Sequence, residues 1–171
     1  FYEGEVFAMS DGSDSHNLAA SNALVALTLH LRGAPCRVFS SDMRLQLSAN
    51  RHYCYPDVFV TCDPRDRTPE SRLLKQHPKL VVEVLSPSTA DYDRGLKFEQ
   101  YRQLDSLEEV LFIDTDRRAA ELYQRGQAPQ WLLTPARVGD VLHLRSVDLR
   151  LEVAALFEGL DDEPVPATPA P

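Results

Sequence analysis

LVVEVLSPST, at residues 80–89, is the most informative stretch of this sequence. Its apolar and β-branched part has the length of a buried strand, and the Pro and small polar residues that follow end that strand. An ionisable residue, Glu83, nevertheless lies in the middle of it. A buried carboxylate is costly unless a partner pairs with it, protonates it or coordinates it. The strand therefore predicts that another part of the chain supplies a partner to Glu83.

Composition limits the class of protein. The chain has 171 residues, 43% of them hydrophobic and 26% charged, which suits one domain with a real core and is too short for two ordinary ones. It contains no apolar run of transmembrane length and no signal-peptide pattern, so we expect a soluble, cytoplasmic protein. The net charge of -8 argues against a general nucleic-acid-coating protein, but it allows a local site where metal ions offset phosphate charge.

We expect one domain over residues 1–160 and a disordered tail over residues 161–171, which are acidic and then Pro-rich. The three cysteines are Cys36, Cys54 and Cys62, an odd number without a CxxC spacing. This pattern favours three buried or half-buried thiols over a disulfide framework or a structural zinc site.

The order of the predicted elements indicates a mixed α/β, or α+β, sheet domain. Apolar periodicity and helix-stop residues predict helices over residues 16–31 and 93–104. Apolar runs and alternation predict strands or extended segments at residues 2–9, 36–47, 55–62, 80–85, 110–114 and 119–124, then short β pieces at 131–133 and 141–151 and a helical turn at 153–160. The resulting order is β-α-β-β-β-α-β followed by further C-terminal strands.

Local signals add detail to the two helices. Asp14 or Ser15 is expected to cap the first helix. In the second helix, Leu96, Tyr101 and Leu104 recur on one side, which predicts the face that packs on the sheet.

Two carboxylates and a lysine follow one another on the predicted strands and the second helix. Asp57 stands near the start of one strand, and Glu83 lies within the next one. Neighbouring strands bring such side chains together, and two carboxylates that close either share a proton or bind a hard divalent cation such as Mg²⁺. The side chain of Lys97 is long enough for its ammonium group to reach the two carboxylates, and Tyr101 lies one turn further on the same face of the helix.

A metal held by two carboxylates, together with a lysine, suits phosphodiester hydrolysis. The metal holds a phosphate oxygen and lowers the pKa of a bound water. The lysine orients that water or stabilises the charge that develops in the transition state. The sequence therefore predicts a hydrolytic site with Mg²⁺ or Mn²⁺ as its cofactor.

Four motifs stand in the order and spacing of a known family: YPDV at 55–58, VEVLSPST at 82–89, DRGLK at 93–97 and then Tyr101. Together they resemble the Uma-type family of bacterial restriction-endonuclease-like proteins, within the PD-(D/E)XK nuclease superfamily. Similarity extends to most of the chain, up to about Leu156, and includes GEVFAM at 4–9, His16-Asn17, Leu31-Arg32-Gly33 and Phe112-Ile113-Asp114.

The resemblance implies a restriction-endonuclease-like core, DNA as the substrate and a homodimer. It also implies metal ligation by Asp57 and Glu83, with the Val84 backbone carbonyl as a further ligand. One position departs from the superfamily pattern, because Leu85 stands where a lysine is usual. Lys97, on the following helix, is the lysine that matches.

A third acidic ligand, often carried by the first helix of the superfamily, has no counterpart in residues 16–31. That ligand is missing, lies upstream of Phe1, or is replaced by His16 or Asp42. His16 at a helix start equally suits a capping role, and Asp42 suits a turn.

The main candidates also have plain structural interpretations. Asp57 follows a proline as turn residues do, Glu83 would face water on an edge strand, Lys97 would be a solvated helix lysine, and Tyr101 would be part of the core. The connection at residues 63–79 is rich in basic side chains that either contact phosphates or are solvated: Arg65, Arg67, Arg72, Lys75 and Lys79.

Three functions remain open from the residues. The first is a metal-dependent DNA endonuclease that uses Asp57, Glu83 and Lys97. The second is a nuclease-fold protein without catalysis that acts as a binding or regulatory module, which the acidic net charge and the displaced lysine favour. The third is a carboxylate-pair hydrolase of sugars, which the low aromatic content of 8% with one Trp does not favour.

Overall fold

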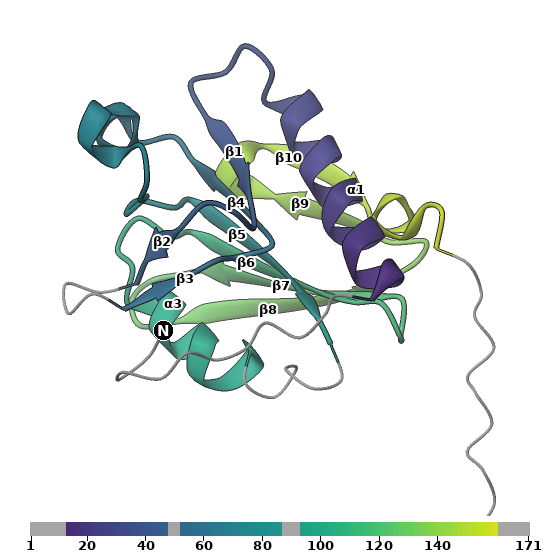
Figure 1. Cartoon of the computed structure of the whole chain (residues 1–171). Helices are drawn as coiled ribbons and strands as arrows, with labels where there is room; N and C mark the ends of the chain where they lie inside the picture. The colour runs from purple at the N-terminus through teal and green to yellow at the C-terminus, as the bar shows by residue number, and fades with distance from the viewer. Residues whose placement is uncertain (1–12, 48–51, 87–92, 161–171) are drawn as a thin grey trace, which may run out of the picture.

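A six-stranded mixed sheet forms the centre of the molecule (Figure 1). The computed structural model describes residues 13–47, 52–86 and 93–160. In spatial order the strands are β1 (Arg37–Ser40), β4 (Val58–Thr61), β5 (Leu80–Leu85), β6 (Glu109–Asp114), β7 (Ala119–Arg125) and β8 (Trp131–Arg137). All neighbouring pairs are antiparallel except β5 and β6, which run parallel. The expected mixed α+β sheet is thereby confirmed.

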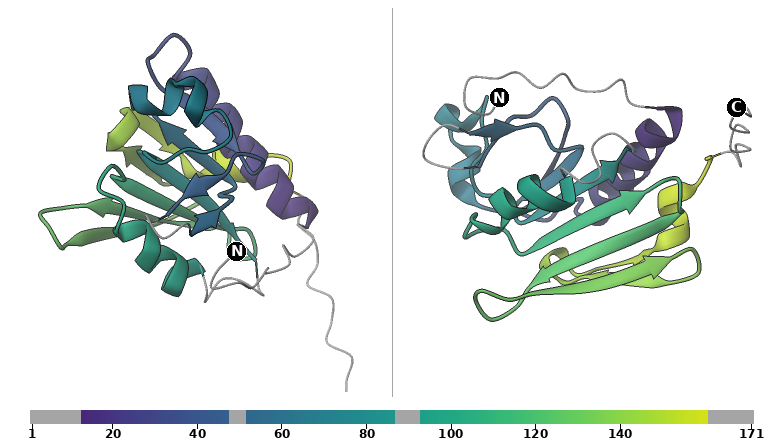
Figure 2. Two further views of the ribbon diagram at one scale, coloured as in Figure 1. Left: turned by 60° about the vertical axis from the view of Figure 1, so that its left-hand side comes forward. Right: turned by 90° about the horizontal axis from the view of Figure 1, so that it is seen from below.

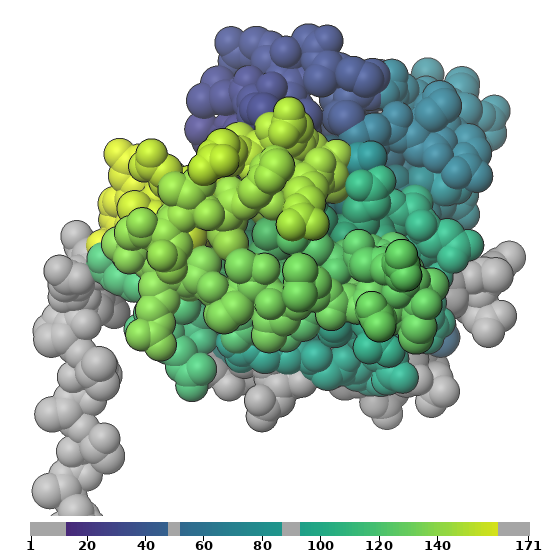
Figure 3. Space-filling view, turned by 180° about the vertical axis from the view of Figure 1, so that it is seen from behind, coloured from purple at the N-terminus to yellow at the C-terminus, as the bar shows by residue number. Residues whose placement is uncertain are grey.

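Each face of the sheet has its own core, because side chains alternate between faces along a strand. On one face, α1 (Asp14–His30) and the hairpin of β9 (Val141–Leu144) and β10 (Leu149–Glu152) pack over residues such as Val82 and Leu111. The other face is covered by α3 (Phe98–Arg102), which packs over residues such as Val81 and Phe112. Figure 2 shows the two layers on opposite sides of the sheet, and Figure 3 shows the C-terminal strands spread over the back of the molecule.

Short elements connect these parts. They are the strand pair β2 (Leu45–Gln46) and β3 (Tyr53–Cys54), the π-helical turn η3 (Asp93–Lys97), and the 3₁₀ turns η1 (Pro64–Arg67), η2 (Pro69–Ser71), η4 (Arg145–Val147) and η5 (Val153–Phe157). The turn η3 leads directly into α3, so the helix expected over residues 93–104 is a π-helical turn followed by a short α-helix.

Several predicted details differ from the structure. Ser13, rather than Asp14 or Ser15, caps α1, and its hydroxyl accepts from the His16 N–H at 3.1 Å. Leu96 does not belong to the buried side of its helix, because it is 40% exposed and Phe98 packs on the sheet in its place. The predicted strand at 2–9, the turn that follows Ser86 and the tail at 161–171 lie outside the described residues.

The expectation of three free thiols is wrong, because Cys36 and Cys62 form a disulfide. Arg37 pairs with Thr61 at the end of the β1–β4 ladder, so the next residues on both strands face each other, with Cα atoms 4.0 Å apart. Cys54 is the free cysteine. The count and spacing of cysteines could not reveal this pair, since antiparallel pairing of distant strands brings them together. Within the described residues, no helix has the length and apolarity to cross a membrane.

Candidate active site

The two predicted carboxylates lie side by side because of how β4 pairs with β5. The register places Val58 opposite Val82, so one further step along both strands places Asp57 opposite Glu83. The Val84 N–H points toward β4 and donates to Asp57 Oδ2 at 2.8 Å. The Asp57–Glu83 pair is therefore a non-hydrogen-bonded pair of the ladder, in which side chains come closest.

Pro56 ends the ladder beside this pair. The same register places Pro56 opposite Val84, and proline has no N–H to donate. The Val84 N–H binds the carboxylate of Asp57 instead, and the Val84 carbonyl, on the same side of the strand, receives no hydrogen bond from Pro56. The register thus places two carboxylates and one backbone carbonyl, the three ligand groups that the resemblance implied, at the same end of the β4–β5 ladder.

Glu83 is buried in the sheet. Its strand lies between β4 and β6, and the residue is only 3% exposed, which excludes the water-facing edge position. Burial raises the pKa of Glu83 to about 7, with a smaller contribution in the same direction from Asp57. The positive charge of Lys97 and the hydroxyl of Tyr101 oppose this shift, because both stabilise the ionised carboxylate.

Lys97 is the cationic partner of Glu83. Its ammonium nitrogen lies 2.9 Å from Glu83 Oε1 and 3.4 Å from Asp93 Oδ1. Burial by itself would lower the pKa of Lys97, but the charges of Glu83 and Asp93 outweigh burial and raise it. Lys97 is therefore a permanent cation and hydrogen-bond donor at neutral pH, which suits charge stabilisation and not proton abstraction.

Tyr101 and Asp93 complete the surroundings of this ion pair. The Tyr101 hydroxyl donates to Glu83 Oε1, and the ring is fully buried. Burial raises the pKa of Tyr101 well above its ordinary value, so the hydroxyl keeps its proton. The Cys54 sulfur lies 3.4 Å from the same hydroxyl. Asp93 and Cys54 were missed as neighbours of the site. The four-residue spacing of Asp93 and Lys97 was the available signal for the first, and the sequence held none for the second.

His16 joins the first helix to the carboxylates. Its Nε2 lies 3.0 Å from Asp57 Oδ1, so the two Asp57 oxygens are held by His16 and by the Val84 N–H. The hydrogen bond to Asp57 raises the pKa of His16 despite partial burial. Its Nδ1 is buried and has no hydrogen-bond partner. His16 thus brings the start of the first helix to the carboxylate of Asp57.

Other predicted accessory residues lie apart from this cluster. Asp42 is exposed in the turn after β1, and in the described part of the chain the hydrogen bonds and ion pairs of Asp57, Glu83 and Lys97 are made with other residues. Lys75 is buried, so it fits neither of its two predicted roles, a phosphate contact or a solvated side chain. Its ammonium donates to the carbonyls of Asp66 and Ser71 at 2.8 and 2.6 Å.

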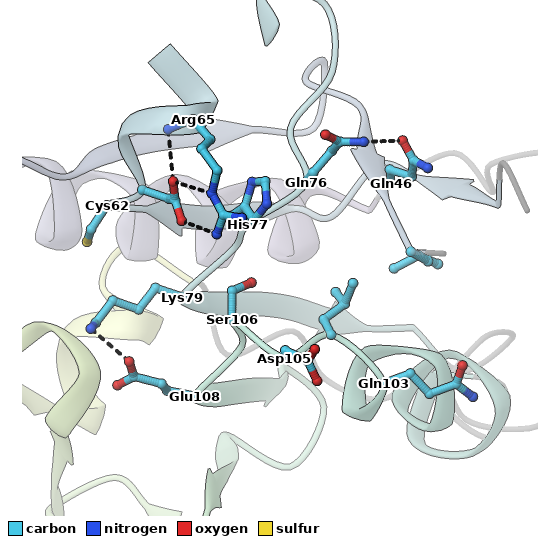
Figure 4. Close-up of a pocket in the computed structure, with 13 residues that line it drawn as sticks. Gln46, Cys62, Arg65, Gln76, His77, Lys79, Gln103, Asp105, Ser106 and Glu108 are labelled. Atoms are coloured by element: carbon cyan, nitrogen blue, oxygen red, sulfur yellow. Dashed lines mark hydrogen bonds and ion pairs between the residues drawn. The ribbon is translucent and has the colours of Figure 1, made fainter. Parts of the chain in front are cut away.

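The other basic residues of the connection are accessible. Arg67 and Arg72 are exposed, whereas Arg65 and Lys79 line a polar groove of about 830 Å³ (Figure 4). In the groove each cation has an acidic neighbour, Asp63 for Arg65 at 2.6 Å and Glu108 for Lys79 at 2.8 Å. Because Lys79 precedes β5 and Glu83 lies four residues on, the groove and the carboxylates are about 13 Å apart along the strand.

The donor set fits a divalent cation of the Mg²⁺ type. In the described part of the chain, no three His, Cys, Asp or Glu side chains converge as metal ligands. A cation would therefore rely on Asp57, Glu83, the Val84 carbonyl and water, which suits Mg²⁺ because it prefers oxygen and keeps several of its waters. It would also offset the negative charge of Asp57, which adds to the effect of burial in raising the pKa of Glu83.

Comparison with known proteins identifies the family. The family model Uma2, described as "Putative restriction endonuclease", matches residues 1–155. The uncharacterized protein slr1290 of Synechocystis is 36% identical over 160 residues, which cover 94% of this chain and 83% of that protein. A second uncharacterized Synechocystis protein, sll1609, is 37% identical over 134 residues, which cover 78% of this chain and 76% of that protein.

The fold has a solved counterpart. A crystal structure described as a putative nuclease belonging to DUF820, from Anabaena variabilis, superposes with a TM-score of 0.72 at 17% identity, covering 91% of this chain and 87% of that one. At this identity the likeness concerns the fold. The family model and the relatives carry the assignment by sequence, and by them the chain belongs to the Uma2 family of restriction-endonuclease-like proteins.

Proposed function

We propose that this protein is a DNA endonuclease that hydrolyses phosphodiester bonds with Mg²⁺ or Mn²⁺ as cofactor. The observation that carries the proposal is the ion pair of Lys97 with the buried Glu83, next to Asp57. Membership of the Uma2 family supports a nuclease. A buried Glu83 beside a half-buried Asp57, with a lysine delivered to it, has no evident use in stabilising the sheet, since apolar residues would fill the same space at lower cost.

The residues divide the work as follows. Asp57, Glu83 and the Val84 carbonyl would hold the cation, which would supply charge to the phosphate and acidify a bound water. Lys97 would donate to the attacking water or to the phosphate oxygens as negative charge develops on them. The donors on Asp57, from His16 and from the Val84 backbone, fix the orientation of that carboxylate.

Plasmid cleavage tests the proposal. Supercoiled DNA is incubated with the wild-type protein in Mg²⁺ or Mn²⁺, and with Glu83→Gln, which keeps the shape of the side chain. Glu108→Gln is the matched control, because Glu108 also pairs with a lysine but lies in the groove. We expect the wild type and the control to nick the plasmid at similar rates, and we expect the rate of nicking by Glu83→Gln to be at least 100-fold lower. Equal nicking by all three proteins would point to a contaminant and contradict the proposal.

A nuclease-fold module without catalysis is the second candidate. The net charge of -8 and the acidic partners of Arg65 and Lys79 favour it, because they weaken the attraction to phosphate. Calorimetry with Mn²⁺ separates the two candidates. Saturable binding that is lost in Asp57→Asn supports the enzyme, and no binding at millimolar metal supports the module.

The proposal includes two properties that accompany such enzymes. Cleavage of both strands of a duplex calls for two sites, so we propose that the protein acts as a homodimer. We also propose that it acts in the cytoplasm, where bacterial DNA lies, as the sequence led us to expect. Light scattering after gel filtration, with and without a DNA duplex, tests the first property, and a monomer under both conditions would contradict it.

A further inference from the structure

The turn that carries Lys97 is attached to the sheet at two points. Lys97 reaches Glu83 on β5 at 2.9 Å. Arg94, one turn earlier, reaches Glu121 on β7 with two nitrogens, both at 3.1 Å, and its guanidinium lies 3.5 Å from Asp114 at the end of β6. A single turn of chain therefore spans three strands of the sheet.

The register of the sheet sets the two attachment points. Glu83 is opposite Phe112, and Phe112 is opposite Glu121, so these three residues form one row across β5, β6 and β7. Residues in one row point to the same face, and two strand spacings separate Glu83 from Glu121 by about 10 Å. Arg94 and Lys97 lie over this row and each takes one of its carboxylates.

Two residues of the turn, Gly95 and Leu96, give it little support from their side chains. Gly95 offers no side chain, and a Cβ atom added there would meet nothing within 4 Å. Leu96 is 40% exposed. The backbone is π-helical over residues 93–97, a conformation that is rare and that is frequent at functional sites. One ion pair alone would allow the turn to rotate about that contact, whereas two fix its orientation.

We propose that Arg94, held by Glu121, is a positioning residue for Lys97. It acts through the turn and keeps the Lys97 ammonium on Glu83, without touching the substrate. A lysine at this position could not replace it, because only the planar guanidinium binds a carboxylate through two nitrogens. The catalytic consequence rests on the proposed function, but the placement of the ammonium group does not.

Nuclear magnetic resonance tests the placement without reference to activity. A lysine ammonium that is ion-paired and largely shielded from water gives a slowly exchanging ¹⁵N signal. The Lys97 side chain is 16% exposed, so the wild type should show such a signal and Lys97→Met should remove it. We expect Arg94→Gln and Glu121→Gln to abolish or broaden it while the amide spectrum stays folded. Arg117→Gln is the control, since Arg117 also neighbours Asp114 at 3.8 Å but is 78% exposed. An unchanged ammonium signal in both variants would overturn the proposal.

Kinetics tests the consequence, if the wild type cleaves DNA. We expect Arg94→Lys and Arg94→Gln to lower kcat by about 10- to 100-fold, with KM for DNA and the affinity for Mn²⁺ unchanged, because a displacement near 1 Å has that effect. Arg94→Gln combined with Lys97→Met should lose no more than Lys97→Met alone. A raised KM with an unchanged kcat would make Arg94 a DNA contact and overturn the proposal. An inactive wild type would refute the proposed function. The resonance experiment would then decide by itself whether Arg94 positions Lys97.

Discussion

At the scale of the single residue, two opposing effects set the pKa of Glu83. Burial in the centre of the sheet favours its neutral form, while Lys97 and Tyr101 favour the carboxylate. Burial is the larger effect, so the pKa is raised to about 7. In the metal-free protein, Glu83 therefore binds a proton at a higher pH than an ordinary glutamate does. This difference makes the free energy of unfolding depend on pH.

Stability without metal should fall as pH rises. Between the ordinary pKa of 4.5 and about 7, the folded protein binds a proton at Glu83 that the unfolded chain does not. The stabilisation is complete below pH 4.5 and is lost as pH rises through 7, by about 3 kcal/mol at most. Urea unfolding in the presence of a chelator, at pH 5 and at pH 8, measures this difference in unfolding free energy.

Glu83→Gln is the control for this pH dependence, because glutamine cannot titrate. The difference in unfolding free energy between pH 5 and pH 8 should be smaller in the variant than in the wild type. A difference of the same size in both proteins would show that Glu83 ionises normally despite its burial.

At the level of elements, the sequence revealed the strands more clearly than it revealed the turns. Glu83 was conspicuous because a charge interrupts an apolar strand, and the order of strands was enough to place Asp57 beside it. The four-residue spacing of Asp93 and Lys97 was visible in the sequence, but the π-helical backbone of residues 93–97 was not, because apolar periodicity predicts an ordinary α-helix there. Lys75 was misplaced for a similar reason, since composition cannot separate a solvated lysine from one that binds carbonyls inside a loop.

Lys75 should stabilise its loop and leave DNA binding unaffected. Its ammonium satisfies the carbonyls of Asp66 and Ser71 and lies over the ring of Phe39. Lys75→Met removes the donors, so we expect a loss of about 1–3 kcal/mol in unfolding free energy. DNA affinity, measured by fluorescence anisotropy, should not change. The exposed Arg72→Gln is the control, with no loss of stability. A folded, stable Lys75→Met with weakened DNA affinity would contradict this interpretation.

Pro56 should increase metal affinity, because it leaves the Val84 carbonyl at the end of the β4–β5 ladder free to bind the cation. Proline leaves the Val84 carbonyl without a donor from the residue opposite. Pro56→Ala supplies an N–H at that position, which would compete with the cation for the carbonyl oxygen. We expect Mn²⁺ affinity, measured by calorimetry, to fall by about tenfold, while Asp57 keeps its bond from Val84. Unchanged affinity would remove the Val84 carbonyl from the set of ligands.

On the scale of the whole molecule, the fold class was predictable and one covalent link was not. Runs of apolar residues and the resemblance to a family were enough for a mixed sheet with helices on it. The pairing of Cys36 with Cys62 depends on which strands are neighbours and in which register. That information belongs to the assembled sheet and leaves no trace in the spacing of cysteines.

Reduction of this disulfide should weaken the fold and spare the site. The link joins residues 26 positions apart, and closing a loop of that length constrains the unfolded chain by about 3 kcal/mol. We expect urea unfolding in a thiol reductant to show a loss of that order, with the midpoint shifted and Mn²⁺ affinity retained. The disulfide holds the far ends of β1 and β4, while Asp57 stands at the opposite end of β4. The Cys36→Ser/Cys62→Ser double variant should be as stable as the reduced wild type and insensitive to reductant. Loss of metal binding on reduction would instead mean that the link supports the carboxylates, and would couple the site to the redox state of its compartment.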